Sequence, residues 1–341
     1  MLTIWVTTAC NLCCKYCYEG EEKEKSFMQH STAVDLIEWI KSWMDEKGKR
    51  FEQIRFHGGE PLLNMPIIRY LVARLNESEY EFDYGLTTNG YLLSKENADF
   101  LAENIDELAV SIDGCKKCND AYRVLKTGAG TFDQVFSNAL YLKEKKQDIA
   151  IRMTVRADMV ERLYENVVFM VDNGFNNIIS ALDIFDDNWT KEKMDILESQ
   201  CDLLREKLSS YDNTLLDVSL PIQGKIKKRV CMGGIDGVNI APDGTFYPCS
   251  YTVSEELLSC GDIYTGIVND KIKCFEEIYN TKIEACLGCT NYEYCPSTRC
   301  KFINKKRMGD YFSPIPILCA VQNRESRRYR KLHCVGTVDE E

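Results

Sequence analysis

The chain has 341 residues and a formal net charge of −11 at pH 7, and 17 of its residues are cysteines. This length can bury a large core and favours one large domain with a smaller one beside it. Because nucleic acids and anionic membranes attract positive surfaces, the negative charge argues against both as main partners.

The start of the chain and its cysteine content indicate the compartment. No charged and apolar signal segment precedes Leu2, and no apolar run is long enough to span a bilayer. We therefore expect a cytoplasmic protein. Thiols stay reduced in the cytoplasm, so cysteine clusters there indicate metal binding or catalysis.

The N-terminal part alternates short apolar strands with amphipathic helices. The pattern predicts six strands, at residues 2–8, 53–57, 84–88, 107–112, 150–155 and 177–182. Helices are predicted at residues 31–47, 66–75, 94–104, 131–145, 164–173 and 191–209. Thr131 and Gln134 are expected to form a capping box. Such alternation predicts an α/β fold with parallel pairing through right-handed crossovers.

The pattern changes after residue 209. Residues 238–247 predict a β-hairpin whose turn is Asp243-Gly244. Beyond the hairpin, cysteines and short loops dominate, and a segment so poor in long periodic elements would need metal to fold. We therefore expect a first domain at 1–215 and a cysteine-rich domain at 216–341.

Ten cysteines fall into two groups whose spacings indicate iron–sulfur ligation. Cys10, Cys14 and Cys17 form C-x3-C-x2-C after the first expected strand, and Cys13 does not fit this spacing. The second group comprises Cys231, Cys249, Cys286, Cys289, Cys295, Cys300 and Cys319. Zinc is the alternative for both groups, but zinc takes a fourth ligand, often histidine, and no histidine lies in the first loop. Three thiolates leave one iron of a four-iron cluster open to a small molecule.

Three further stretches follow in chain order. They are Phe56-His57-Gly58-Gly59-Glu60-Pro61, Thr87-Thr88-Asn89-Gly90, and Val110-Ser111-Ile112-Asp113-Gly114 leading to Asp120-Ala-Tyr-Arg123. Together with the cysteine loop, they make the chain resemble radical S-adenosylmethionine (SAM) enzymes that carry a C-terminal SPASM-type domain. The resemblance covers nearly the whole chain. It implies a partial (β/α)6 barrel followed by a small, cysteine-rich auxiliary-cluster domain.

The resemblance also implies the cofactors. In that superfamily the cysteine loop holds a [4Fe-4S] cluster whose open iron binds SAM, which makes Cys10, Cys14 and Cys17 the catalytic cluster ligands. The second cysteine group would hold two auxiliary [4Fe-4S] clusters, giving three in all. SAM-binding roles are implied for Tyr16, Gly58, Gly59, Glu60, Asn89, Ser111 and Arg123. The family often has a histidine where this chain has Asn119, so no role is assigned there.

The second cysteine group is expected to divide between the two auxiliary clusters. Cys231, Cys249 and Cys300 are expected to hold one auxiliary cluster, and the other four cysteines of the second group the other. The first of these clusters lacks a fourth ligand; we favour an open iron, with Cys260 or Cys274 as the alternative. Cys115 and Cys118 lie outside the family pattern and are expected to be surface thiols, with a redox or substrate-binding role as the alternative. Two further cysteines have no expected ligand role: Cys201, which we expect on the core face of a helix, and Cys334.

The resemblance implies a reaction as well. The reduced cluster and SAM together give a 5′-deoxyadenosyl radical, which removes a hydrogen atom from an unreactive C–H bond. SPASM-type enzymes mostly act on peptides or proteins. We therefore expect a maturase that modifies a ribosomally made peptide by forming a thioether or other crosslink, in an anaerobic or low-oxygen host.

Two other functions are weighed against this one. A sulfatase-type maturase would oxidise Cys or Ser to formylglycine; in that family an Asp commonly follows the position of Cys249, where this chain has Ser250. A non-catalytic electron-transfer protein is the third, which the intact Gly-Gly-Glu-Pro and Asn-Gly motifs argue against. Expected partners are the peptide or protein substrate and an electron donor such as flavodoxin or ferredoxin. Because no leader-binding segment precedes Leu2, we expect the substrate either to dock directly or to be brought by a separate leader-peptide-binding protein.

Overall fold

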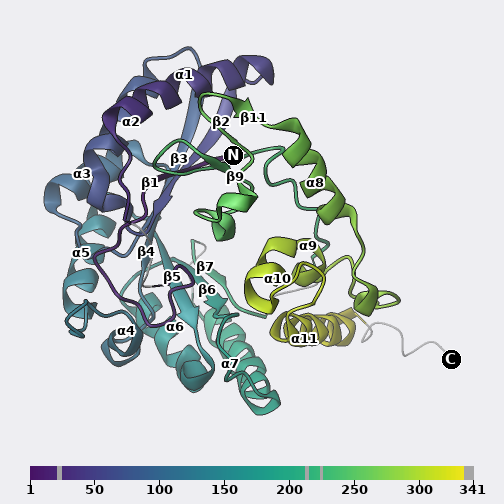
Figure 1. Cartoon of the computed structure of the whole chain (residues 1–341). Coiled ribbons are helices and arrows are strands. Elements are labelled where there is room, and N and C mark those ends of the chain that lie inside the picture. Colours follow the sequence, from purple (N-terminus) through teal and green to yellow (C-terminus); the bar gives the residue numbers. More distant parts are fainter. Residues whose placement is uncertain (21–24, 212–214, 223–225, 334–341) are drawn as a thin grey trace.

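The computed structural model describes residues 1–20, 25–211, 215–222 and 226–333 (Figure 1). Its centre is a nine-stranded sheet in the order β7-β6-β5-β4-β3-β2-β1-β8-β9. The strands are β1 Leu2–Thr7, β2 Phe51–Gly58, β3 Glu81–Thr88, β4 Glu107–Ser111, β5 Ala150–Val155, β6 Asn177–Leu182, β7 Asp217–Ser219, β8 Asn239–Ile240 and β9 Phe246–Tyr247. All neighbours pair in parallel except β8 and β9, which pair antiparallel. A separate antiparallel pair joins β10 (Gly261–Asp262) to β11 (Gly266–Ile267).

Helices surround this sheet. They are α1 His30–Glu46, α2 Met65–Asn76, α3 Lys95–Asn104, α4 Lys116–Tyr122, α5 Phe132–Lys145, α6 Leu163–Asp172, α7 Lys191–Ser209, α8 Asn269–Asn280, α9 Pro296–Arg299, α10 Lys301–Met308 and α11 Pro316–His333. Short 3₁₀ turns lie at Pro61–Asn64, Ala157–Arg162, Ser250–Thr252, Glu256–Leu258 and Glu284–Cys286. Helices α1 to α6 cover the outer side of the curved sheet, and the C-terminal elements lie across its open side (Figure 1).

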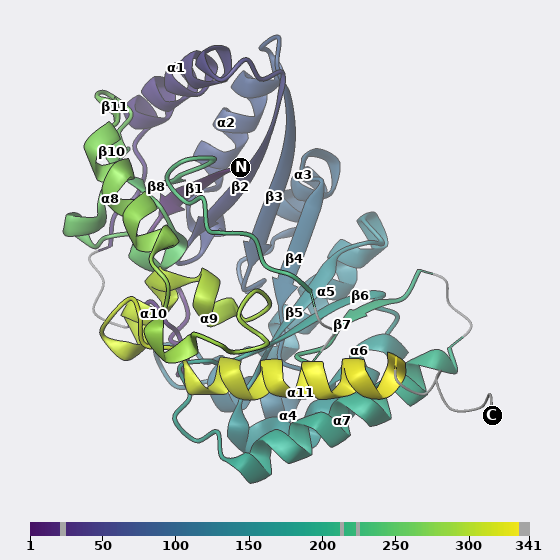
Figure 2. The ribbon, with the colours of Figure 1, turned by 90° about the vertical axis from the view of Figure 1, so that its right-hand side faces the viewer.

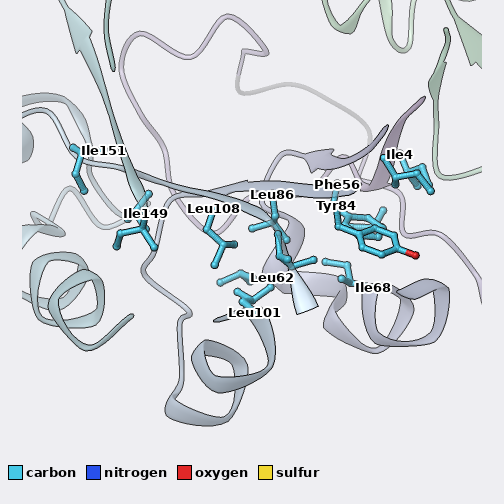
Figure 3. Close-up of a cluster of buried hydrophobic side chains, with 14 of the residues drawn as sticks. Ile4, Phe56, Leu62, Ile68, Tyr84, Leu86, Leu101, Leu108, Ile149 and Ile151 are labelled. Atoms are coloured by element: carbon cyan, nitrogen blue, oxygen red, sulfur yellow. The ribbon is translucent and has the colours of Figure 1, made fainter. Parts of the chain in front are cut away.

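The core lies between the sheet and its outer helices. Buried strand residues such as Ile4, Phe56 and Leu86 meet helix residues such as Ile68 and Leu101 (Figure 3). Burying a leucine or isoleucine side chain contributes about 1.5–3 kcal/mol, so this layer supplies much of the folding energy. The alternating pattern thus predicted the six strands correctly, and each lies within three residues of its expected bounds.

The structure corrects three local expectations. Thr131 makes no side-chain cap; its hydroxyl donates to the carbonyl of Arg123 (2.9 Å), and Asp120 accepts from the backbone N–H groups of Thr131 and Phe132 (both 2.8 Å). The C-terminal part is not dominated by loops, because α8 and α11 are long helices. The hairpin at 238–247 forms as predicted, but β8 also pairs with β1 and extends the sheet.

Strands from both sides of residue 215 therefore share one sheet: β7 adds to one edge and β8–β9 to the other. The division into domains 1–215 and 216–341 stays a prediction. Cys334 lies outside the described residues.

The last helix ties the C-terminal part to the barrel. Helix α11 runs beside α7 (Figure 2), and its Arg324 pairs with Asp195 and Glu198 of α7. Arg324 is only 6% exposed, whereas Asp195 and Glu198 remain partly exposed, so these ion pairs lie at the edge of the interface between the two helices. Since Cys319 lies in the first turn of α11, the contact also helps to position one predicted cluster ligand.

Within the described residues, no helix combines the length and the apolar composition that crossing a membrane requires.

Candidate active site

A cavity of about 670 Å³ opens where the parallel strands end. Its walls come from the loop after β1, the ends of β2, β3, β4 and β6, and β5. The carboxyl ends of parallel strands meet at one edge of a sheet, which explains why motifs distant in sequence gather here. The residues predicted for the first cluster and for SAM all line it: Cys10, Cys14, Tyr16, Cys17, Gly58, Gly59, Glu60, Asn89, Ser111 and Arg123.

The cysteine loop is held from two sides. Backbone N–H groups of Cys13 and Lys15 donate to the carbonyls of Val124 (2.8 Å) and Tyr122 (3.1 Å). On the other side, the Asn89 amide donates to Asn11 Oδ1 (2.9 Å) and lies 3.7 Å from Cys10 Sγ. The loop therefore has a fixed shape without any disulfide among its cysteines.

The thiols of this loop suit metal ligation. Burial raises the pKa of Cys10 to about 11 and that of Cys14 to about 12. Such thiols stay protonated at neutral pH unless a cation binds them, because a coordinating thiol is deprotonated by its metal. Three soft sulfur donors, with an amide directed at one of them, fit an iron–sulfur cluster.

Gly58 and Gly59 are required by the close approach of two chain segments. A Cβ on Gly58 would lie 2.2 Å from the carbonyl oxygen of Thr7, and one on Gly59 would lie 2.4 Å from that of Ala9. Gly58 also has a φ of +148°, which side chains disfavour. The end of β2 thus packs backbone to backbone against the start of the cysteine loop.

Glu60 is fully buried and accepts hydrogen bonds from three neighbouring groups. Its carboxylate accepts from the Thr88 hydroxyl (2.7 Å) and from the backbone N–H groups of Asn89 (2.7 Å) and Leu62 (3.0 Å). Burial raises the pKa of Glu60 to about 7, although these hydrogen bonds act in the opposite direction. Glu60 therefore positions Asn89, which in turn contacts the cysteine loop.

Asp113 organises the opposite wall, and sequence reasoning assigned it no role. It accepts two hydrogen bonds from Arg123 (3.0 and 3.1 Å), one from the Tyr16 hydroxyl (2.5 Å) and one from the backbone N–H of Thr154 (2.8 Å). The Arg123 guanidinium, predicted to bind SAM, is thus already paired with a carboxylate. Asp113 is buried, and nothing in the Ser-x-Asp-Gly pattern of the sequence indicated these contacts.

An aromatic wall, formed by Tyr18, Phe185 and Tyr251, was also missed. The ring of Tyr18 lies 4.8 Å from that of Tyr251 and 6.5 Å from that of Phe185. Tyr251 lies two residues after Cys249, so this wall connects the first cysteine loop with the C-terminal segment. Arg152 of β5 lines the cavity beside these rings.

Within the second cysteine group, the thiols that influence one another's pKa lie in the same expected set, and their binding of clusters stays a prediction. Burial raises the pKa of Cys249 to about 11, with further contributions from the nearby Cys231 and Cys300. The hydrogen bond with Cys295 and burial raise the pKa of Cys319, and the nearby Cys286 and Cys289 raise it further. Among the described residues, no three His, Cys, Asp or Glu side chains converge on a single metal ion. The ligands of a four-iron cluster surround a larger body and need not do so.

The other predicted thiols are placed as follows. Cys201 and Cys260 are fully buried in the core, whereas Cys274 is exposed. Burial raises the pKa of Tyr279 most, and the nearby Cys231, Cys249 and Cys260 raise it further. Cys260 therefore lies near the first auxiliary set. Cys118 is buried rather than on the surface, which contradicts that part of the prediction.

Comparison with known proteins adds the family. Residues 4–168 match the model of the Radical SAM superfamily. These residues belong to this superfamily. As a radical SAM enzyme the protein uses SAM and an iron–sulfur cluster, and its fold is the superfamily's open barrel with a SPASM-type C-terminal extension.

Its relatives and structural neighbours include peptide-modifying enzymes. The chain is 24% identical to a cysteine-type anaerobic sulfatase-maturating enzyme of Clostridium novyi, over 87% of this chain and 86% of that one. Its fold matches native anSMEcpe with bound AdoMet and Kp18Cys peptide at a TM-score of 0.79 and 18% identity, covering 98% and 97% of the two chains. It also matches Streptococcus suis SuiB bound to precursor peptide SuiA at a TM-score of 0.69 and 16% identity, covering 93% and 75%.

Proposed function

We propose that this radical SAM enzyme is a maturase that modifies a ribosomally made peptide by forming a thioether or another crosslink. The main support for the proposal is the cavity, which is lined both by the cysteine loop and by Tyr251 of the C-terminal segment. Its volume of about 670 Å³ spans from the cysteine loop to Tyr251 beside the first auxiliary cysteine set. Pockets of about 300–1,000 Å³ hold drug-sized ligands. SAM and one or two peptide side chains would fill such a space.

We further infer three [4Fe-4S] clusters. Cys10, Cys14 and Cys17 would hold the SAM-binding cluster. The auxiliary clusters would be held by two sets: Cys231, Cys249 and Cys300; and Cys286, Cys289, Cys295 and Cys319. When bound, SAM supplies the oxidising radical that removes a hydrogen atom from the substrate.

The chain's own residues orient and enclose the reactants. The proposed SAM contacts all line the cavity; they are Tyr16, Gly58, Gly59, Glu60, Asn89, Ser111 and Arg123. Asp113 holds Tyr16 and Arg123 in place, and Glu60 does the same for Asn89. The aromatic wall would exclude water from the reacting side chain, which suppresses quenching by solvent.

Formylglycine formation, the reaction expected of a sulfatase-type maturase, is the second candidate, because the Clostridium novyi relative is named a cysteine-type anaerobic sulfatase-maturating enzyme. One residue weighs against it. Ser250 follows Cys249, and its hydroxyl donates to Asn239 Oδ1 (2.8 Å). A serine hydroxyl is a poor acid or base near neutral pH, so it does not replace a carboxylate in proton transfer.

The test is incubation of the reconstituted enzyme with SAM, a reductant and candidate peptides under anaerobic conditions. A crosslinked product that has lost hydrogen but retained its cysteine sulfur supports our proposal. A cysteine that loses its sulfur and gains an aldehyde would support the second candidate. Absence of SAM cleavage by a fully loaded enzyme would refute both.

The proposal includes partners and location. We propose a flavodoxin or ferredoxin as electron donor, a separate leader-peptide-binding protein, and a cytoplasmic site of action. Pull-down with a tagged precursor peptide, with and without the candidate leader-binding protein, tests the second of these.

A further inference from the structure

The proposed function leaves Cys115 and Cys118 unused. Cys115 is the residue before α4, and Cys118 lies in its first turn. Their Sγ atoms are 3.8 Å apart, and the backbone N–H of Cys118 donates to the carbonyl of Cys115 (3.0 Å). Neither thiol belongs to a predicted cluster set, so another role is open to them.

The geometry of the pair matches a dithiol that can close. A disulfide needs an S–S distance of about 2.05 Å and Cα atoms roughly 4.4–6.8 Å apart. Residues three apart at the start of a helix meet the second condition, since they lie one turn apart. Rotation about the two Cα–Cβ bonds brings the sulfurs together, so the backbone can stay in place.

The surroundings hold this backbone in that arrangement. The Cys115 N–H donates to Asn166 Oδ1 (3.2 Å), and the Asn119 N–H donates to the Cys115 carbonyl (3.0 Å). Gly114 has a φ of +102°, and a Cβ on it would lie 2.3 Å from the side chain of Asn166. A pair that is held close in the reduced state loses little freedom on closing.

The two thiols differ in access. Cys118 is 2% exposed, whereas Cys115 is half-buried and open to solvent on one side. Burial raises the pKa of Cys118 to about 11, which makes it a slow attacking group. An external disulfide must therefore react first at Cys115, and Cys118 completes the exchange.

We propose that Cys115 and Cys118 form a redox-active site that exchanges with thiol–disulfide compounds. The Cys115 thiolate attacks the disulfide RSSR and releases one thiolate. The Cys118 thiolate then attacks Cys115 Sγ and releases the second. The protein loses two electrons and two protons in total, and RSSR is reduced to two RSH. The new bond lies two residues from Asp113, which holds Tyr16 and Arg123 at the cavity.

The test uses cluster-loaded enzyme kept free of oxygen and equilibrated with glutathione disulfide and glutathione at several ratios. Iron is counted before and after, so that cluster thiols stay occupied. After alkylation, trypsin cuts after Lys116 and Lys117 and separates the two cysteines onto peptides 96–116 and 118–123. Each peptide contains one cysteine, so a joined pair of peptides identifies the disulfide.

We expect the joined peptides to appear as glutathione disulfide rises and to vanish on reduction. Cys118→Ser should stop at a glutathione adduct on Cys115, while Cys115→Ser should leave Cys118 unmodified. The buried Cys201 is an internal control and should stay unmodified. The proposal is overturned if both peptides remain separately alkylated under a large excess of glutathione disulfide, or if either cysteine pairs elsewhere. Circular dichroism of the variants confirms that they are folded.

Discussion

The Asp113–Arg123 ion pair gives the most direct test of how the cavity is built. The two side chains are 5% and 9% exposed, and each carboxylate oxygen accepts one hydrogen bond from Arg123. In Asp113→Asn one of these oxygens becomes an NH2 group. Whichever way the amide turns, a donor then faces an Arg123 N–H, and the buried guanidinium loses its counter-charge.

Removing one partner of a buried ion pair costs about 3–5 kcal/mol, a large part of a typical total stability of about 5–15 kcal/mol. We expect Asp113→Asn to lower the free energy of unfolding by that amount. It should also weaken SAM binding by about tenfold, since Tyr16 and Arg123 line the cavity. In Asp113→Asn/Arg123→Met no buried charge remains, so the loss should fall to about 1–2 kcal/mol.

The assay is urea unfolding of the cluster-loaded proteins, followed by circular dichroism, with equilibrium dialysis of SAM. Arg50→Met is a matched control, because Arg50 pairs with Glu79 at an exposed site and should cost little. A loss below about 1 kcal/mol for Asp113→Asn would refute the reasoning, as would a double variant as unstable as the single one.

Three further predictions concern the cofactors and Glu60. Cys14→Ala should abolish 5′-deoxyadenosine production and reduce the iron content from about twelve to about eight per chain, because the auxiliary clusters load independently; unchanged cleavage of SAM would contradict the ligand assignment. Cys260→Ala and Cys274→Ala should each keep the full iron content if the first auxiliary cluster has an open iron, and loss of iron in either variant would identify the missing ligand. The pKa of Glu60 rises from 4.5 to about 7 on folding, so the folded state binds a proton more tightly and is stabilised at low pH. Between pH 4.5 and pH 7, the free energy of unfolding should therefore fall by about 3 kcal/mol relative to that of Glu60→Gln. Urea unfolding at several pH values measures this difference. The same pH dependence of the unfolding free energy in both proteins would exclude the contribution.

Local signals in the sequence were enough for the barrel and for the position of its motifs. The period of the apolar residues determined strands such as β5 and β6, whose bounds agree with those predicted. The cysteine loop and Gly58-Gly59 each follow a strand, and parallel strands bring such positions to one edge. Gly58 and Gly59 were predicted as SAM contacts; the structure adds a second reason for glycine at both positions, because a Cβ there would meet the backbone carbonyls of Thr7 and Ala9.

Local signals failed where the structure depends on partners distant in the chain. Thr131 and Gln134 matched a capping box, but Asp120 accepts from the helix N-terminus instead. The C-terminal region was predicted to be mostly loops, because the many charged residues of α11 weaken the apolar period that indicates a helix. The helix packs Ile317 and Val321 into the core, and its Arg324 pairs with residues of α7 that lie more than a hundred positions earlier.

The sequence by itself therefore indicated the fold class and the superfamily, and it predicts which thiols bind iron. These follow from spacing and periodicity, which are properties of short segments. Only the tertiary structure decided how the cavity is closed. Asp113 holds Tyr16 across 97 positions, and Tyr251 brings the auxiliary segment against Tyr18. Hydrogen bonds and ring contacts of this kind depend on distances set by the whole packed sheet, which no local pattern encodes.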